Sequence, residues 1–158
     1  MDFTALHMKD CKPRLDGTPA VFHAFRVGII LASFRFSPTT IAAGILHDLL
    51  EDGTATDDQL LHAFGPGVAT LVRALTHDPG DSDEQILERV KAGGIYAMAI
   101  KLADNTDNIR TIECFELEKR KWYLEYAQKI QKQGREMLNI HPIVDWHEQE
   151  LFRASKKL

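Results

Sequence analysis

The chain has 158 residues, of which 44% are hydrophobic and 27% are charged, a balance typical of a globular protein. The formal net charge of -4 at pH 7 argues against binding to a polyanion through overall charge, so we expect no nucleic-acid partner. This length predicts a single domain, residues 1–158, that is large enough to bury a sizeable core.

Three features predict a cytoplasmic protein without a membrane partner. The most apolar segment, residues 27–36, is interrupted by Arg35 and is too short to span a bilayer. The chain starts with Asp2 instead of a basic residue and no apolar run follows, so we expect no signal peptide. Cys11 and Cys114 form no metal or redox pair motif and are expected to remain reduced thiols.

The first predicted element is a short helix over residues 1–10, which a basic turn follows. Lys9, Lys12 and Arg14 gather between this helix and the Asp-Gly pair at 16–17. Because basic loops are often only solvated surface, two interpretations stay open: a solvated loop, or a loop that faces a phosphate group.

A second helix is predicted after Thr18 and Pro19, because threonine is a good amino-terminal cap and proline fits the first turn. Its apolar side carries Phe22, Phe25, Ile29 and Ile30. His23 lies among these residues. A lone histidine there is either a buried core residue or a metal ligand, and the second interpretation needs further ligands elsewhere.

Residues 37–53, SPTTIAAGILHDLLEDG, predict a central helix around which the rest of the chain packs. Ser37 is a good amino-terminal cap, and Gly53 can close the carboxyl end. Apolar residues recur between them at helical spacing. A capping box at Thr56 and Gln59 then predicts the next helix.

Polar residues crowd the last turns of this predicted central helix. His47 and Glu51 are four residues apart, as are Asp48 and Asp52, so each pair shares a helix face. Three carboxylates at the negative end of a helix dipole repel one another, which indicates a compensating cation. A divalent metal bound by His47 and Asp48 meets this need, and a solvated acidic helix end is the alternative.

Residues 95–111, IYAMAIKLADNTDNIRT, form the second unusual stretch. An apolar helix leads into the polar run 104–108, whose residues are poor helix formers. Asp104, Asn108 and Thr111 lie at offsets of zero, four and seven, so a continued helix would align them in one polar stripe. The alternative is a helix end followed by a polar turn.

Amphipathic helical patterns occupy the rest of the chain, and no segment shows the alternation typical of a strand. His62 and His77 fall near predicted helix ends and need no special role. The sequence therefore predicts an all-α protein. It contains no pattern that predicts an oligomeric state.

These motifs together resemble the HD-domain phosphohydrolases, which fold as all-α helical bundles. The likeness is nearest to the hydrolase domain of RelA/SpoT-type proteins and to the stand-alone small alarmone hydrolases. It covers about residues 9–111 and rests on DGTP at 16–19 before His23, HDLLED at 47–52, FGPGVATLV at 64–72 and KLADNTDNIRT at 101–111, with a weaker similarity at 122–127.

The resemblance implies a manganese-dependent enzyme that removes pyrophosphate from the 3′ position of guanosine tetra- or pentaphosphate. The implied metal ligands are His23, His47, Asp48 and Asp104. Glu51 and Asp52 match the catalytic acidic pair, Asn108 and Thr111 match nucleoside contacts, and Lys12 and Arg14 occupy the place of a loop that contacts phosphate and base. Two imidazoles and two carboxylates suit an intermediate divalent ion better than magnesium.

Such an ion would lower the pKa of a bound water and polarise a phosphoryl oxygen. We expect Glu51 and Asp52 to reach the same cavity, where one of them positions that water and moves its proton.

The sequence departs from the family pattern at Ala20, Ala24 and residues 105–107, and we expect these changes to affect the substrate side more than the metal side. They leave two alternatives: a hydrolase of another nucleotide, or a catalytically silent module that senses a nucleotide or a protein. The intact Glu51 and Asp52 favour an enzyme.

Overall fold

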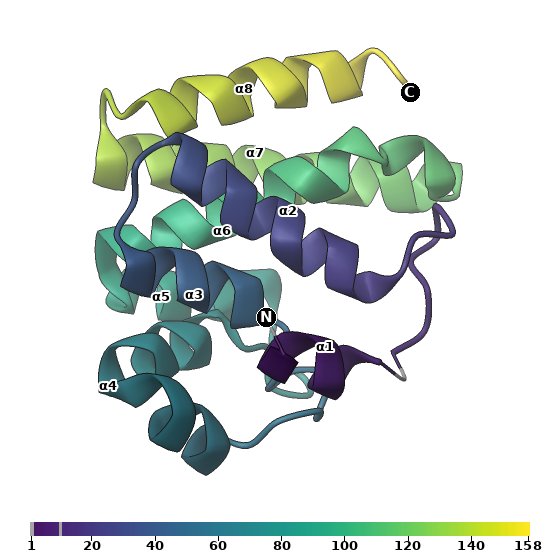
Figure 1. Ribbon diagram of the computed structural model, residues 1–158. Helices are drawn as coiled ribbons and strands as arrows, with labels where there is room; N and C mark the ends of the chain where they lie inside the picture. The colour runs from purple at the N-terminus through teal and green to yellow at the C-terminus, as the bar shows by residue number, and fades with distance from the viewer. Residues whose placement is uncertain (1, 10) are drawn as a thin grey trace.

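The computed structural model describes residues 2–9 and 11–158, and all regular structure within them is helical (Figure 1). The elements are α1 (Asp2–Met8), α2 (Ala20–Ser33), α3 (Pro38–Leu46), α4 (Asp57–Leu75), α5 (Asp83–Ala92), α6 (Gly94–Arg110), the short 3-10 helix η1 (Ile112–Cys114), α7 (Leu117–Leu138) and α8 (Pro142–Ser155). The prediction of an all-α fold is confirmed. The ends of the helix predicted over 1–10, Met1 and Asp10, lie outside the described residues.

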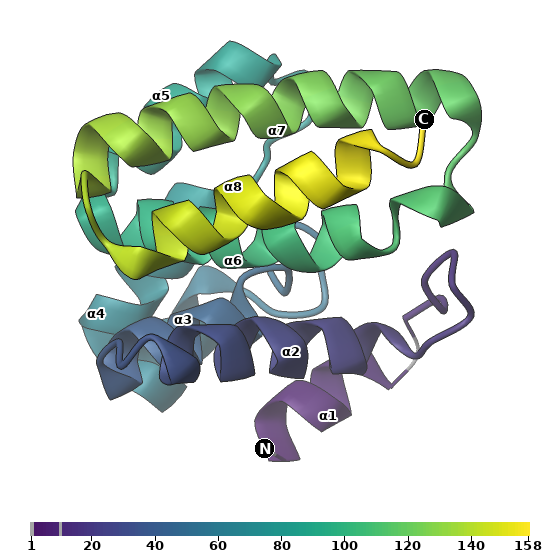
Figure 2. The same ribbon diagram turned by 90° about the horizontal axis from the view of Figure 1, so that it is seen from above.

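Helix α6 lies between α7 and α8 on one side and α2 and α3 on the other (Figure 2). Helices α4 and α5 also pack against it, and α1 packs against α2. Residues 97–107 of α6 are buried without interruption, as expected for a helix enclosed on every side. The centre of the domain is therefore α6 rather than the predicted helix over 37–53.

The predicted helix over 37–53 is shorter than expected. It begins as predicted, with the hydroxyl of Ser37 accepting a hydrogen bond from a backbone N–H of the first turn. It ends at Leu46, and residues 47–53 form consecutive turns. Gly53 closes them with a φ of +65°, a conformation that glycine adopts without a steric penalty.

The side chain of His47 helps to end α3. Its Nδ1 donates to the backbone carbonyl of Gly44 at 2.8 Å, which satisfies an acceptor that a further helical turn would use. The three carboxylates that follow would also oppose the helix dipole if the helix continued. These residues therefore leave the helix and form a compact turn beside α6.

Two further local predictions can be compared with the structure. The capping box at Thr56 and Gln59 is confirmed at the start of α4. The polar run of α6 is helical, because α6 continues to Arg110, so the alternative of a helix end followed by a turn is wrong. No helix in the described part of the chain combines the length and apolar character needed to cross a membrane.

Candidate active site

The polar run of α6 is buried, and its side chains have partners from elsewhere in the fold. Asp104, Asn105 and Asp107 are 7%, 1% and 3% exposed. Asp104 faces two histidines, Asp107 contacts one of them, and Asn105 contacts His147 of α8. Buried polar groups without partners are costly, so these contacts explain how poor helix formers persist at the centre of the core.

Two imidazoles and two carboxylates meet where α2, the turn after α3 and α6 come together. His23 Nε2 and His47 Nε2 lie 3.2 and 3.6 Å from Asp104 Oδ1. Asp48 Oδ1 lies 2.9 Å from His47 Nε2, and its Oδ2 lies 3.7 Å from His23 Nε2. One donor atom from each of His23, His47 and Asp48 lies within 4.8 Å of the others, a spacing that a single metal ion could bridge.

Both histidines present Nε2 to this centre. His47 Nδ1 donates to the Gly44 carbonyl at 2.8 Å, and His23 Nδ1 donates to Asp107 Oδ2 at 2.7 Å. In a neutral imidazole the other nitrogen then carries the lone pair that binds a metal. His47 Nε2 is buried and makes no hydrogen bond, although Asp48 Oδ1 is near. A bound cation would satisfy this nitrogen.

The carboxylates of Asp48 and Asp104 favour a positive group in this centre. Burial lowers the pKa of His47, but the carboxylates of Asp48 and Asp104 outweigh it and hold that pKa well above its usual range. Burial raises the pKa of Asp104, but Lys101 and the two imidazoles hold it well below its usual range. The carboxylates thus favour positive charge at this centre, and a divalent cation bound there would supply it.

The acidic pair lines two different cavities. Glu51 borders a cavity of about 160 Å³ together with His23, His47, Asp48 and Asp104. Asp52 borders a neighbouring cavity of about 770 Å³, and Asp48 borders both. The two cavities adjoin at Asp48, so a shared role of Glu51 and Asp52 stays a prediction, and residues 47–53 hold the pair in turns rather than in helical register. Partial burial and the charge of Asp48 raise the pKa of both carboxyls.

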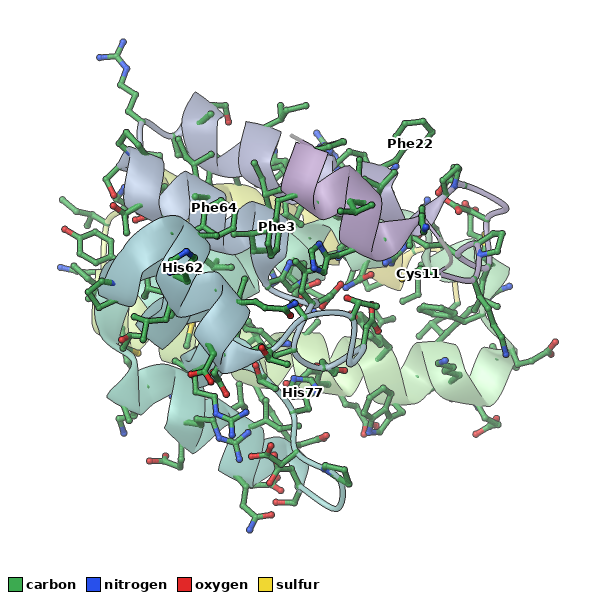
Figure 3. All side chains as sticks on the ribbon, turned by 60° about the horizontal axis from the view of Figure 1, so that its bottom comes forward. Phe3, Cys11, Phe22, His62, Phe64 and His77 are labelled. Atoms are coloured by element: carbon green, nitrogen blue, oxygen red, sulfur yellow. The ribbon has the colours of Figure 1, made fainter. Side chains whose placement is uncertain are left out.

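Sequence analysis missed two residues that line the smaller cavity, Lys101 and His77. Lys101 Nζ donates to Asp104 Oδ2 at 3.2 Å and lies 3.4 Å from His77 Nε2. His77 follows α4 (Figure 3), and its backbone N–H donates to Glu51 Oε2 at 3.4 Å. Lys101 precedes Asp104 by three residues on one helix face, a signal that could have been used. No periodic pattern marks His77, because it lies in a connection.

Aromatic side chains of α7 form another wall of the smaller cavity. Trp122, Tyr123 and Tyr126 line it, and the ring of Trp122 stacks on that of Tyr126 with centroids 5.7 Å apart. Trp122 remains 46% exposed, so its face is accessible from outside. From the sequence, residues 122–127 showed only a weak similarity to the family and an amphipathic helical pattern.

Of the four residues expected to bind substrate, Arg14 borders both cavities and a third hollow. Its guanidinium donates to Asn108 Oδ1, and Asn108 Nδ2 donates to Asp104 Oδ1 at 2.7 Å. Lys12 lies on the larger cavity, and Thr111 lies on the third hollow. Of the four, only Arg14 and Asn108 border the smaller cavity, and the role of the set in substrate binding stays a prediction.

The residues that depart from the family pattern do not all lie on the substrate side of the site. Ala20 lines the larger cavity, as expected for a change on the substrate side. Asn105 and Asp107 instead contact His147 and His23 inside the protein. The expectation that residues 105–107 affect mainly the substrate side is therefore wrong, since Asp107 touches a candidate metal ligand.

Comparisons with known proteins agree with this geometry. Residues 2–132 match the sequence profile of the HD domain family. The chain belongs to the HD domain family. The predicted resemblance, including its RelA/SpoT-type branch, is confirmed by the relatives that follow.

Curated relatives share a modest identity with this HD domain protein. A probable guanosine-3′,5′-bis(diphosphate) 3′-pyrophosphohydrolase of Mycoplasma genitalium is 28% identical over 146 residues, which cover 82% of this chain and 20% of the relative. The bifunctional (p)ppGpp synthase/hydrolase SpoT of Escherichia coli is 29% identical over 140 residues, with the same coverages. The chain thus spans about a fifth of the length of these relatives.

Two solved structures match over most of their length. One, described as a metazoan ortholog of SpoT that hydrolyses ppGpp, has a TM-score of 0.84 and 27% identity, covering 99% of this chain and 93% of that one. The other, lmo0812 from Listeria monocytogenes, has a TM-score of 0.73 and 26% identity, covering 85% of this chain and 99% of that one.

Proposed function

We propose that this HD domain protein is a metal-dependent hydrolase that removes pyrophosphate from the 3′ position of guanosine-3′,5′-bis(diphosphate) or its pentaphosphate form. The convergence of His23, His47, Asp48 and Asp104 beside the carboxylate of Glu51 carries the proposal. The match to the metazoan SpoT ortholog over 99% of the chain supports the substrate, because that protein is described as hydrolysing ppGpp.

The proposed metal is manganese, bound by His23, His47, Asp48 and Asp104. The two Nε2 atoms that face the centre and the two carboxylates form a mixed nitrogen and oxygen donor set, which suits Mn²⁺ better than Mg²⁺. When bound, such an ion supplies Lewis-acid activation of a water molecule and of the phosphoryl group.

Glu51 is the proposed general base, because it borders the smaller cavity and its raised pKa brings it closer to neutrality. It accepts a proton from the water that attacks the phosphorus next to the 3′ oxygen. A new phosphorus–oxygen bond forms, the bond from phosphorus to the 3′ oxygen breaks, and that oxygen takes up a proton. Pyrophosphate and a 5′-phosphorylated guanosine are the products. Asp52 acts from the neighbouring cavity, where it orients the substrate or shares the proton.

Positive groups near the centre are suited to hold phosphates. Lys101 is buried in the smaller cavity, and Arg14 borders both cavities. The larger cavity has a volume typical of ligand sites, and Lys12 lies on its wall. We assign phosphate contacts to Lys12 and Arg14, because their positive charges complement the negative charges of an ionised substrate.

Asn108 and Thr111 are proposed to contact the nucleoside. Asn108 accepts a hydrogen bond from Arg14 and borders the smaller cavity, and Thr111 lies with Arg14 on the third hollow.

The proposed catalytic unit is the whole chain, residues 1–158, as one domain. The family match ends at residue 132, but α8 packs against α6 and α7 and its His147 supports the polar run of α6. A cytoplasmic location, without membrane or nucleic-acid partners, remains the sequence-based prediction.

A manganese-supplemented assay over a nucleotide panel tests this function. The panel contains guanosine tetra- and pentaphosphate, nucleoside monophosphates and other pyrophosphorylated nucleotides, and the detection separates pyrophosphate from orthophosphate. We expect pyrophosphate from the guanosine polyphosphates and none with His47→Ala. Turnover of only another nucleotide would support the first alternative, and binding without turnover in manganese would support a sensing module.

A further inference from the structure

A buried carboxylate links the two helices that carry His23 and Asp104. Asp107 Oδ2 accepts a hydrogen bond from His23 Nδ1 at 2.7 Å, and its Oδ1 accepts one from Arg26 Nε at 2.7 Å. Asp107 is 3% exposed and His23 is 1% exposed, so the bond between them is shielded from water, whereas the bond from Arg26 is partly buried. Both carboxylate oxygens are thus occupied by charged or polar donors from one helix, α2.

The register of both helices creates this arrangement. Arg26 follows His23 by three residues on α2, so both side chains leave the same helix face. Asp107 follows Asp104 by three residues on α6, so one α6 face presents both carboxylates to α2. The contact between α2 and α6 therefore holds a candidate ligand and the group behind it in one fixed geometry.

The two candidate histidine ligands are held in different ways. The Nδ1 of His47 donates to a backbone carbonyl, which is neutral, whereas that of His23 donates to a carboxylate. A carboxylate behind a metal-binding imidazole fixes its tautomer and ring orientation and makes the ligand nitrogen more basic. The other oxygen of the Asp107 carboxylate pairs with the guanidinium of Arg26 at 2.7 Å, so a positive group holds this carboxylate behind His23.

We propose that Asp107, held in place by Arg26, is a positioning residue that fixes His23 for metal binding. The inference rests on the metal site of the proposed function. Asp107 does not border the metal centre itself; it acts through His23. Arg26 has a buried Nη2 without a hydrogen-bond partner, so the bond from its Nε to Asp107 is what orients the guanidinium.

The test measures manganese affinity of the full chain without nucleotide. Equilibrium dialysis against Mn²⁺ compares wild type with Asp107→Ala, Asp107→Asn and Arg26→Met. We expect an affinity loss of about 10–100-fold for Asp107→Ala, the range for groups behind a ligand. Asp107→Asn keeps an acceptor without the charge, so a smaller loss is expected. Arg26→Met keeps the carboxylate but frees its orientation, so an intermediate loss is expected.

Glu150→Gln is the matched control. Glu150 is a buried carboxylate that accepts hydrogen bonds from Arg110 and Arg153, but it touches no candidate ligand. We expect this variant to lower the melting temperature and to keep the manganese affinity within about twofold of wild type. A loss of stability alone would therefore be separated from a loss of metal binding.

A second readout distinguishes positioning from general structural damage. If Asp107 acts through metal binding, the hydrolysis rate of Asp107→Ala is restored by excess manganese, and Mn²⁺ raises its melting temperature only at higher concentration than in wild type. If Asp107→Ala does not fold, the near-isosteric Asp107→Asn and Arg26→Met decide the question by the same measurements.

The proposal is overturned if the folded Asp107 and Arg26 variants bind Mn²⁺ as tightly as Glu150→Gln. If the wild type is active, the proposal is also overturned when excess manganese restores no activity to variants that bind the ion weakly. Because the dialysis uses the metal alone, a chain that binds manganese through His23 yet hydrolyses no guanosine polyphosphate would contradict the proposed function and leave this inference standing.

Discussion

The two sides of the candidate site come from different kinds of structure. The side formed by His23, His47, Asp48 and Asp104, here called the metal wall, comes from α2, the turn after α3 and buried α6. The side formed by Lys12, Arg14, Asn108 and Thr111, here called the substrate wall, includes an irregular segment between α1 and α2. Metal ligands need a fixed geometry, whereas charges that contact phosphates tolerate movement, so the difference matches the proposed roles.

The largest expected effect comes from removing a ligand of the metal wall. His47→Ala leaves a vacancy in the donor set and unbalances the carboxylates of Asp48 and Asp104, so we expect manganese affinity to fall by more than about 100-fold. Elemental analysis after dialysis measures the bound metal. His62→Ala, a change at an exposed histidine of α4, is the control and is expected to bind metal normally. Equal metal in wild type and His47→Ala would contradict the assignment.

The second largest effect separates metal binding from chemistry. Glu51→Gln keeps the metal wall intact but removes the proposed base, so we expect the rate of hydrolysis to fall by about a hundred- to ten-thousand-fold with the metal retained. Asp52→Asn is expected to have a smaller effect because Asp52 borders the neighbouring cavity. The double variant is expected to lose nearly all hydrolysis. Steady-state kinetics with measured metal content provide the test.

The double variant Glu51→Gln, Asp52→Asn also tests how these carboxylates affect the stability of the fold. Burial and Asp48 raise the pKa of both carboxyls, which means that their ionised forms destabilise the folded state at neutral pH. Neutral amides at both positions are therefore expected to raise the melting temperature slightly. Wild-type turnover, or loss of the metal, would show that these carboxylates do not have the assigned role.

A third prediction concerns His147, which supports the metal wall from behind. Its ring is fully buried between Asn105 and Gln131, and burial lowers its pKa to about 4. Between that value and the unfolded pKa of about 6.5, the unfolded chain binds more protons. Neutral His147 therefore makes its full contribution to the free energy of unfolding above pH 6.5. As the pH falls towards 4, this contribution decreases by about 3 kcal/mol at most.

Urea denaturation from pH 4.5 to 7 of wild type and His147→Gln measures this contribution. We expect the difference in the free energy of unfolding between the two proteins to shrink as the pH falls. Contributions from His23 and His47, whose pKa values are raised, cancel in the difference. An unchanged difference across this range would show that His147 is not the group that titrates.

Local patterns in the sequence predicted the structural features that are determined by residues close together in the chain. The cap at Ser37, the capping box at Thr56 and the helical character of each segment follow from short-range spacing. His47, Asp48 and Asp104 could be named as candidate ligands because they lie in HDLLED and KLAD, two compact motifs that carry the family resemblance. The end of α3 at Leu46 was missed, because a bond from the His47 side chain and carboxylate repulsion outweigh the helical periodicity.

Contacts between distant segments left no pattern in the sequence. His23 and Asp107 are separated by 84 positions, and His77 and Glu51 by 26, so only the packing of the helices shows that they meet. From the sequence, Asp107 was interpreted as a departure that affects the substrate side, whereas in the structure it contacts His23. Residues behind the ligands are therefore the part of the site that sequence reasoning is least able to find.

The smallest effect is expected on the substrate wall. Arg14→Ala removes a guanidinium that borders both cavities and donates to Asn108, and Lys12→Ala removes an exposed ammonium. Charge-assisted hydrogen bonds contribute about 1.5–3 kcal/mol, so we expect KM to rise about tenfold or more for Arg14→Ala and less for Lys12→Ala. Because neither residue is a candidate ligand, kcat and manganese affinity should stay near wild type.

Lys91→Ala, which changes an exposed lysine of α5, is the control for lost positive charge and is expected to leave KM unchanged. Higher salt should raise the KM of wild type more than that of Arg14→Ala, since screening weakens a contact that the variant no longer has. The outcome that breaks the comparison is a loss of manganese in Arg14→Ala as large as that in His47→Ala. Arg14 would then position Asp104 through Asn108, and a change in the substrate wall would alter metal binding by the metal wall.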